Sequence, residues 1–119
     1  MKEELIARIL DHLLNAESHS VDLPVIGKYC IVRCRNAGVH AGTVVSADAS
    51  FVVLSDSRRL WRWKTKFTLS EAAVHGIEND GSRVACVVPV LLIPTVDVAE
   101  IIPMSEDAAT TIRRATADE

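Results

Sequence analysis

The feature that most constrains the fold is a change of hydrophobic periodicity at Gly27. From there the segment GKYCIVRCR alternates in the way that a strand with two distinct faces requires. One face receives Cys30, Val32 and Cys34, and the other receives Tyr29, Ile31, Arg33 and Arg35. The chain is therefore expected to build an antiparallel sheet from this point onward.

Further strands are predicted downstream. VHAGTVVSA and SFVVLSD follow a turn signal at residues 36–38 and are joined across Asp48, which predicts a hairpin. SRRLWRWK is predicted as a separate fourth strand because the turn-prone Asp56 and Ser57 precede it. RVACVVPVLLI, bent or stopped at its prolines, and DVAEII complete a β-rich region over about residues 27–102.

Three helices are predicted around these strands. Apolar residues repeat at helical spacing over about residues 2–16, with charges on the opposite side. TLSEAAVHG is predicted as a short helix with Ser70 as its N-cap and Gly76 at its end. Ser105 is predicted to cap a closing helix over about residues 105–115, whose first turn is acidic and whose last turn is basic.

These elements predict an α+β fold: an N-terminal helix, a small twisted antiparallel sheet or open barrel, a short middle helix and a C-terminal helix. At 119 residues the chain is expected to be one domain, residues 1–119. An apolar fraction of 49% is sufficient for a core, so disorder is not expected.

The charges are unevenly distributed. The chain carries a formal net charge of −3, which argues against a general binder of duplex nucleic acid. Five of the 13 basic residues nevertheless fall in RRLWRWKTK, residues 58–66, together with both tryptophans. Any anion site is therefore expected to be local.

RRLWRWKTK admits two interpretations. As a strand it places Arg59, Trp61 and Trp63 on one face, where rings and guanidinium groups would match the base and phosphate of a nucleotide. The alternative is an amphipathic edge strand with tryptophans in the core and arginines in water. No acidic residue lies between Asp56 and Glu71 to pair locally with the cations, which favours the ligand site slightly.

A second cationic stretch leads into the turn at residues 36–38. Arg33 and Arg35 share a strand face, and no acidic residue occurs between Asp22 and Asp48. Small residues beside cations allow backbone N–H groups to approach an anion. The alternative is a β-bulge that only redirects the strand.

No catalytic or metal-binding pattern is recognisable. The histidines and cysteines lack the paired spacing of a zinc site, and no nucleophile elbow or phosphate loop occurs. We therefore expect no enzyme activity, no catalytic residues, no metal and no cofactor. No apolar run is long enough to span a membrane, and Cys30 and Cys34 lie roughly 13 Å apart along a strand, too far for a disulfide. A reduced, cytoplasmic environment is expected.

The sequence resembles the phage Thoeris anti-defence sponge family. The most specific segments are GKYCIVR, NAGVHAG and SRRLWRWK, followed by LSEAAVHGI and by VAEIIP with SEDA before the last helix. The similar region covers roughly residues 25–115. The chain departs from the family pattern at CRNAG, where relatives carry a hydroxyl-bearing turn, and at Ile93-Pro94-Thr95, and these departures concern ligand preference more than overall function.

The resemblance implies a non-catalytic sponge, in the cytoplasm of an infected bacterium, that binds cyclic ADP-ribose isomers and assembles into dimers or hexamers. Some family members also hold cyclic oligonucleotides of the CBASS type, such as cyclic trinucleotides, at a separate site. The resemblance implies that Ala37, Gly38, Arg58 and Arg59 belong to the oligonucleotide-type site. The candidates for the ADP-ribose pocket are the segments around Arg83 and Val84 and the terminal helix. With the residues singled out above, the candidate ligand-binding set is Arg33, Ala37, Gly38, Arg58, Arg59, Trp61, Arg83, Val84 and Arg113.

Other functions remain open at this point. The Trp/Arg strand could serve as a platform for single-stranded nucleic acid, although the acidic balance weighs against a stable nucleic-acid partner. The tryptophans could instead be interface anchors of a phage assembly module. A hydrolase that degrades the messenger is a minor alternative, because the spacing of metal ligands is absent.

Overall fold

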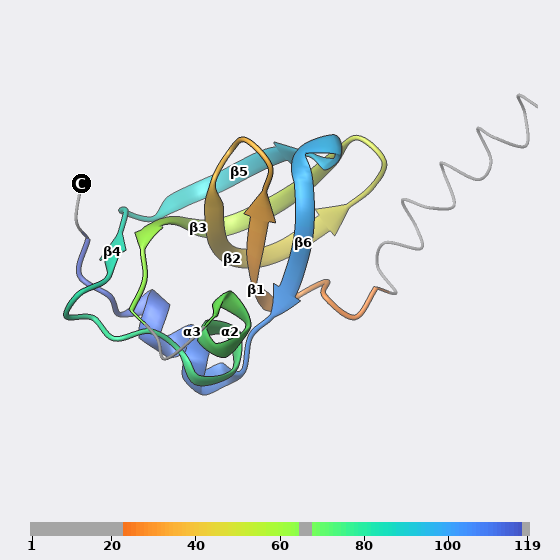
Figure 1. Cartoon of the computed structure of the whole chain (residues 1–119). Helices are drawn as coiled ribbons and strands as arrows, with labels where there is room; N and C mark the ends of the chain where they lie inside the picture. Colours follow the sequence, from red (N-terminus) through yellow and green to blue (C-terminus); the bar gives the residue numbers. More distant parts are fainter. Residues whose placement is uncertain (1–22, 65–67, 118–119) are drawn as a thin grey trace, which may run out of the picture.

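The computed structural model describes residues 23–64 and 68–117, which form an antiparallel sheet of six strands with two α-helices (Figure 1). The elements are β1 (Tyr29–Cys34), β2 (Val39–Ala47), β3 (Phe51–Arg62), α2 (Leu69–His75), β4 (Arg83–Val84), β5 (Val88–Pro94), the 3-10 helix η2 (Thr95–Asp97), β6 (Val98–Pro103) and α3 (Glu106–Arg113). The predicted α+β class is confirmed. The helix predicted over residues 2–16 lies outside the described residues. Within the described part of the chain, no helix has the length and apolar character needed to cross a membrane.

The sheet has the strand order β4-β3-β2-β1-β6, and β5 also pairs with β3. Because β2 occupies one edge of β3, β4 and β5 lie along its other edge, at opposite ends of this long strand. Figure 1 shows α2 and α3 side by side below one end of the sheet. The helices therefore cover only part of the sheet.

The predicted alternation of β1 is confirmed, and both faces of the strand are buried. Tyr29 and Ile31 belong to a core cluster that also contains Ile112 of α3. Cys30 and Val32 belong to a second cluster, which includes Leu54 of β3 and Ile93 of β5. Because each face of β1 packs into its own core cluster, the cysteines and the apolar side chains of this strand are both buried.

The separate fourth strand predicted for SRRLWRWK is wrong, because β3 runs without a break from Phe51 to Arg62. The turn signal at Asp56 corresponds to a bulge: Asp56 has φ of 48°, and the register with β2 shifts opposite it, at Gly42. A Cβ at Gly42 would lie 3.1 Å from the Ser57 Cα, so the strands can approach this closely only at a glycine. The bulge exchanges the two faces of β3. The even-numbered residues of this strand therefore face one core cluster before the bulge and the other cluster after it.

The strand predicted for RVACVVPVLLI is interrupted earlier than its prolines suggest, between Val84 and Val88. Ala85 keeps a backbone bond to β3, with its N–H donating to the Arg59 carbonyl at 2.8 Å. Its own carbonyl accepts from the Arg58 side chain at 2.7 Å instead of from a neighbouring strand. At the interruption, the Arg58 side chain of β3 therefore supplies a hydrogen bond in place of a neighbouring strand.

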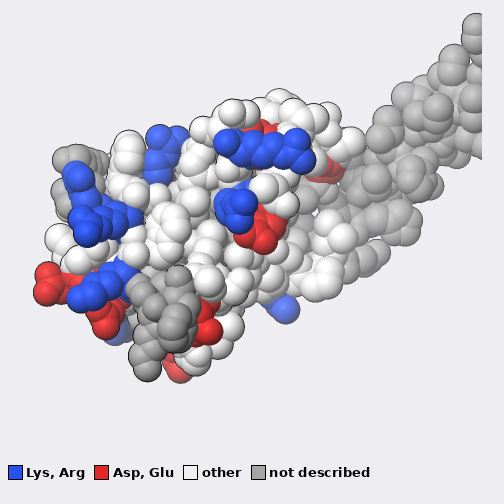
Figure 2. Space-filling model, in the orientation of Figure 1, with Lys and Arg blue, Asp and Glu red and all other residues white. Residues whose placement is uncertain are grey.

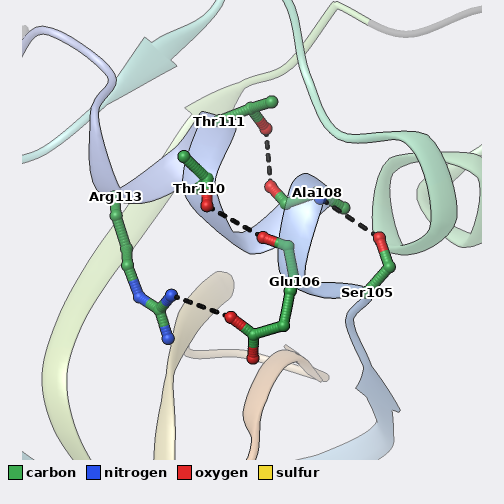
Figure 3. A network of polar contacts seen from close by, with 6 residues as sticks. All are labelled: Ser105, Glu106, Ala108, Thr110, Thr111 and Arg113. Atoms are coloured by element: carbon green, nitrogen blue, oxygen red, sulfur yellow. Dashed lines mark hydrogen bonds and ion pairs between the residues drawn. The ribbon is translucent and has the colours of Figure 1, made fainter.

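The caps of the helices agree in part with expectation. Ser70 is not the N-cap of α2: Thr68 has extended backbone angles, and its hydroxyl accepts from the Glu71 N–H at 3.4 Å. Gly76 ends this helix with φ of 86°, as predicted. Ser105 caps α3 as predicted, because its hydroxyl accepts from the Ala108 N–H at 3.1 Å (Figure 3). Two residues near the start of α2 had the chemistry of an N-cap, and the helix begins after the earlier of them.

Candidate functional site

Arg59 on β3 lies against the turn that joins β1 to β2. Its Nη2 donates to the Ala37 carbonyl at 3.2 Å, and its guanidinium carbon lies 5.4 Å from the centre of the Trp61 ring. Gly38 in the same turn has φ of 88°, and a Cβ there would come within 3.9 Å of Arg59 Nε. The structure therefore brings together four predicted residues: Ala37, Gly38, Arg59 and Trp61.

Asp97 of η2 also holds the turn that joins β1 to β2. Its carboxylate accepts from the Asn36 backbone N–H at 2.9 Å, the Asn36 side-chain amide at 2.8 Å and the Ala37 N–H at 2.9 Å. These bonds, the one from the Ala37 N–H above all, lower the pKa of the Asp97 carboxyl. The backbone donors of Asn36 and Ala37 therefore already hold an anion, and it belongs to the protein itself.

His40 of β2 also holds Ala37. Its Nε2 lies 2.8 Å from the Ala37 carbonyl, and because a carbonyl can only accept, Nε2 carries the proton. Burial lowers the pKa of His40, and the nearby Arg59 lowers it further, while the bond to Ala37 opposes both effects. Ala37 is thus held by side chains from β2, β3 and η2, which makes the turn rigid.

A depression of about 340 Å³ opens beside this turn. Its lining residues are Asn36, Ala37, Gly38, Val39, Arg59, Leu60, Trp61 and Trp63, and we call it the turn pocket. Trp61 is 58% exposed, whereas Trp63 is half-buried and packs on the core cluster between the sheet and the helices. Trp61 is consequently the ring that can stack on a ligand, and Trp63 forms a wall.

Arg58 points to the opposite face of β3 and has a different environment. It is only 4% exposed, and its Nε donates to the Ala85 carbonyl at 2.7 Å. Its Nη1 donates to the carbonyls of Ile112 at 2.8 Å, Ala115 at 2.7 Å and Arg113 at 3.3 Å. A cation at these carbonyls also complements the C-terminal end of the α3 dipole. In this structure Arg58 ties β3 to α3, and it does not line the turn pocket.

A second cavity, of about 290 Å³, lies on the Arg58 side of the sheet. Its lining residues are Tyr29, Thr43, Asp56, Arg58, Val87 and Arg113, and we call it the tyrosine pocket. Two of the predicted residues, Arg58 and Arg113, meet here. The Arg113 guanidinium carbon lies 4.5 Å from the centre of the Tyr29 ring.

The sequence family described as Domain of unknown function (DUF6948) matches residues 27–112, well over half of the chain. The chain belongs to this family. The DUF6948 span contains every residue of the turn pocket and ends one residue before Arg113 of the tyrosine pocket. No curated protein matches the chain.

Three predicted residues of the DUF6948 domain line neither cavity. Arg33 forms an exposed ion pair with Glu100 of β6 at 3.2 Å. Arg83 lies on β4, where the ladder pairs it with Arg62, and Val84 is buried in the core. The structure does not bring these residues to the turn of Ala37 and Gly38.

The basic side chains of the described residues do not form one continuous patch on the face shown in Figure 2. Uncharged surface separates them, and acidic side chains lie beside several of them. Acidic partners for these cations come from other parts of the chain. The Glu78 carboxylate, for example, lies 3.4 Å from Lys64 Nζ. The lack of acidic neighbours along the chain therefore does not mean that the cations are unpaired.

Among the described residues, the buried thiols and the acidic groups form no further candidate site. Burial raises the pKa of the Cys30 thiol to about 11, and it also raises that of Cys34, so both are protonated at neutral pH. Across the ranges 23–64 and 68–117, no three or more His, Cys, Asp or Glu side chains are grouped as a metal site requires.

Sequence reasoning missed Asp97, His40 and Tyr29 as parts of these sites. Asp97 reaches the turn from 60 residues away along the chain, so no local pattern could reveal it. The sequence indicated His40 only weakly, through its position just after the Ala37-Gly38 turn, near the start of the next strand. The alternation of β1 predicts which face of the sheet carries Tyr29. It does not reveal the arginines that line the same cavity.

Proposed function

We propose that this protein is a non-catalytic binding protein that captures a small nucleotide messenger. The turn pocket carries the proposal, since the exposed Trp61 ring lies beside the Arg59 guanidinium over a turn without a side chain at Gly38. A base stacks on such a ring with about 1–3 kcal/mol, and an arginine can hold a phosphate through two parallel bonds.

The rigidity of the turn supports capture. Because Asp97, His40 and Arg59 all hold the Asn36-Ala37 segment before any ligand arrives, binding needs little further ordering of the backbone. The backbone N–H groups of Asn36 and Ala37 are occupied by Asp97, so Arg59 is the group that contacts the phosphate. A preorganised pocket of this kind favours tight binding without turnover.

The messenger class that we propose is a cyclic ADP-ribose isomer, with a cyclic trinucleotide as a second ligand class. The class rests on the resemblance of GKYCIVR, NAGVHAG and SRRLWRWK to the Thoeris anti-defence sponges, together with the base-and-phosphate chemistry of the turn pocket. Sequestration in the cytoplasm of an infected bacterium would suppress anti-phage signalling by mass action.

The proposal is tested by capture and release. Purified protein is mixed with a cyclic ADP-ribose isomer, free ligand is measured after filtration, and the protein is then denatured by heat. We expect depletion of the ligand followed by recovery of the intact molecule. Release of a hydrolysed product would indicate an enzyme, and the absence of depletion for both ligand classes would contradict the proposal.

Matched variants locate the site. Trp61→Ala and Arg59→Gln should each weaken binding at least about tenfold, because each removes one of the two recognition groups. Arg62→Gln is the control, since Arg62 is exposed on the same strand but lines neither cavity. Equal loss in all three variants would point to a general charge effect.

A single-stranded nucleic-acid module is the second candidate, because an exposed ring on a strand is also a stacking platform for successive bases. Salt separates the two functions. Binding of a linear strand weakens steeply as salt rises, whereas a compact ligand with few phosphates is much less sensitive. A steep salt dependence with an oligonucleotide, and no capture of the cyclic ligand, would favour this candidate.

We also propose that the protein forms homo-oligomers. An apolar surface, which we call the β5 face, consists of the exposed side chains Phe51, Val88, Val90 and Leu92. In the described part of the sheet, β5 pairs only with β3, so its outer edge is open. Between Pro89 and Pro94, residues 90–93 carry neither a charge nor a proline to protect that edge, which suits antiparallel pairing with a second copy over this segment.

A further inference from the structure

His40 and Arg59 approach the same backbone oxygen from neighbouring strands. The two residues lie directly opposite each other in the ladder between β2 and β3. His40 Nε2 lies 2.8 Å from the Ala37 carbonyl oxygen, and Arg59 Nη2 donates to that oxygen at 3.2 Å. A positive charge on the imidazole would therefore stand next to the guanidinium to which the proposed function assigns the phosphate.

His40 can change its charge without giving up its bond to Ala37. Because Nε2 already carries the proton that the carbonyl accepts, a second proton must enter at Nδ1. Nδ1 has no hydrogen bond to the described residues and is not fully buried, so water can deliver that proton. Burial lowers the pKa of His40, the Ala37 bond raises it and Arg59 lowers it, and the result lies below 6.5. Without a ligand, the imidazole is therefore mainly neutral at neutral pH.

The other charged and titratable groups near the turn keep a constant charge. β1 places the uncharged Val32 opposite His40, and burial keeps the Cys34 thiol of the same strand protonated. The Asp97 carboxylate of η2 is bonded to N–H groups of the turn, which lowers its pKa from 3.8. The thiol, this carboxylate and Arg59 therefore do not titrate between about pH 5 and about pH 8. Of the described groups at the turn, His40 is the one whose charge changes in this range.

A phosphate on Arg59 would reverse the balance at His40. It would offset the guanidinium charge that opposes protonation, and it would add a negative charge beside the turn. His40 is only 4% exposed, so water and salt screen this interaction incompletely. Each of the two, the anion and the proton, would therefore strengthen binding of the other, because linkage between two sites is reciprocal.

We propose that His40 is a positioning residue that couples the binding of a phosphate in the turn pocket to the uptake of a proton at Nδ1. The proposal rests on the proposed function and deepens it, since capture through Arg59 becomes stronger as pH falls below neutral. A ligand without a negative charge at Arg59 gains nothing from the proton. The coupling therefore favours nucleotides over nucleosides on the acidic side of neutrality.

The effect of Arg59 on His40 is tested first without a ligand. NMR titration of the assigned His40 ring gives its pKa in the wild type and in Arg59→Gln. We expect a higher pKa in Arg59→Gln, because the opposing cation is removed, and no change in Arg62→Gln, at an exposed residue of the same strand. The same pKa in the wild type and in Arg59→Gln would overturn the proposal.

Calorimetry then measures binding of a cyclic trinucleotide and of a cyclic ADP-ribose isomer from about pH 8 to about pH 5. The phosphodiester and pyrophosphate groups of these probes keep their charge in this range, unlike a phosphomonoester, whose second pKa is about 6. We expect at least about threefold tighter binding at the acidic end, with net proton uptake that appears as a dependence of the binding heat on the buffer. Adenosine, which carries no phosphate, should show neither effect.

His40→Gln is the matched variant, because a glutamine amide can also donate to the Ala37 carbonyl but does not titrate. Its affinity for the probes should not depend on pH. His75→Gln, at an exposed histidine 3.4 Å from Glu71, should keep the pH dependence of the wild type. Thermal unfolding shows whether His40→Gln folds, and if it does not, the ligand-free titration of Arg59→Gln decides the proposal.

The outcomes separate this proposal from the proposed function. Binding that is independent of pH in the wild type, or a pH dependence that persists in folded His40→Gln, would overturn the coupling and leave capture in place. Absence of binding by both cyclic probes at every pH would overturn capture and the coupling together.

Discussion

Arg58 and Arg59 are neighbours on β3, and their side chains leave the strand on opposite faces. Arg58 is buried and bonded to the carbonyls at the end of α3, whereas Arg59 is exposed and reaches Ala37 and Trp61. At the scale of the residue, one arginine therefore stabilises the fold and the other is available to a ligand.

A paired substitution tests this division. Arg58→Met should lower the free energy of unfolding by about 3 kcal/mol, because it leaves several buried carbonyls without a donor. Arg59→Met should lower it by less than about 1 kcal/mol, as is usual for an exposed position. Chemical denaturation of both variants provides the measurement. Equal losses would contradict the assignment of Arg58 as the structural residue.

Asp97 is expected to stabilise the turn in a pH-dependent way. The pKa of its carboxyl is lowered from 3.8, so its contribution is complete above that value and is lost as pH falls through the lower pKa of the folded state. Asp97→Asn should therefore lower the melting temperature by a constant amount from neutral pH down to about pH 5 and by less at more acidic pH.

Asp80→Asn, an exposed carboxyl in the loop before β4, is the control for Asp97→Asn. It should leave the melting temperature unchanged over the same pH range. Asp97→Asn should also weaken the turn-pocket ligand, because Ala37 and Arg59 lose a fixed position. A melting difference that grew toward acidic pH would show that the carboxylate is not the stabilising form.

At the scale of the elements, the contact between α2 and α3 depends on Gly76. This residue ends α2 with φ of 86°, and a Cβ there would lie 2.5 Å from Thr111 Oγ1. The Thr111 hydroxyl is already fixed, because it accepts from the Ile77 N–H at 2.9 Å and donates to the Ala108 carbonyl at 2.6 Å (Figure 3). The helix pair thus leaves no room for a side chain at this position.

Gly76→Ala should destabilise the protein by roughly 2–4 kcal/mol, which combines backbone strain with displacement of α3. Gly81→Ala is the matched control: its φ is 96°, but its Cβ would meet only the flexible Lys64 side chain. The smaller loss expected there, about 1 kcal/mol, isolates the backbone contribution. Denaturant unfolding of both variants measures the difference, and equal losses would exclude packing against Thr111 as a cause.

At the scale of the whole molecule, the sheet is covered unevenly. Among the described residues, the helices pack on one part of the sheet, while the β5 face and the outer edge of β5 are exposed. Exposed apolar surface beside an uncharged edge strand is a common sign of an interface. None of the residues that line the turn pocket belongs to β5, so assembly through β5 would leave that pocket open.

Val90→Lys should shift the sedimentation of the protein toward the monomer, because a charge on the β5 face opposes its burial against a second copy. Val74→Lys is the control, since Val74 on α2 is equally exposed, at 58%, but does not belong to the β5 face. A wild-type protein that sediments as a monomer at all concentrations would contradict the proposed interface.

Much of the architecture follows from local sequence alone. The alternation of GKYCIVRCR, the hairpin across Asp48 and the Ser105 cap arise from interactions between residues close in the chain, and the structure confirms them. Neighbouring side chains and backbone groups suffice to specify such features, because period, turn chemistry and capping act over a few residues.

The sites required the tertiary structure. Asp97 meets Ala37, and Arg58 meets Ile112, across 60 and 54 residues of chain, so no local pattern identifies either pair. The bulge at Asp56 also reversed the faces of β3 after the predicted turn, and so decided which arginine is buried. The sequence by itself determined the alternation of β1, the hairpin across Asp48 and the positions of the two described helices, but not where β3 continues or where the strand after Arg83 is interrupted. Only the packing of strands and helices decided which polar groups find partners, and it left the Tyr29 hydroxyl without one.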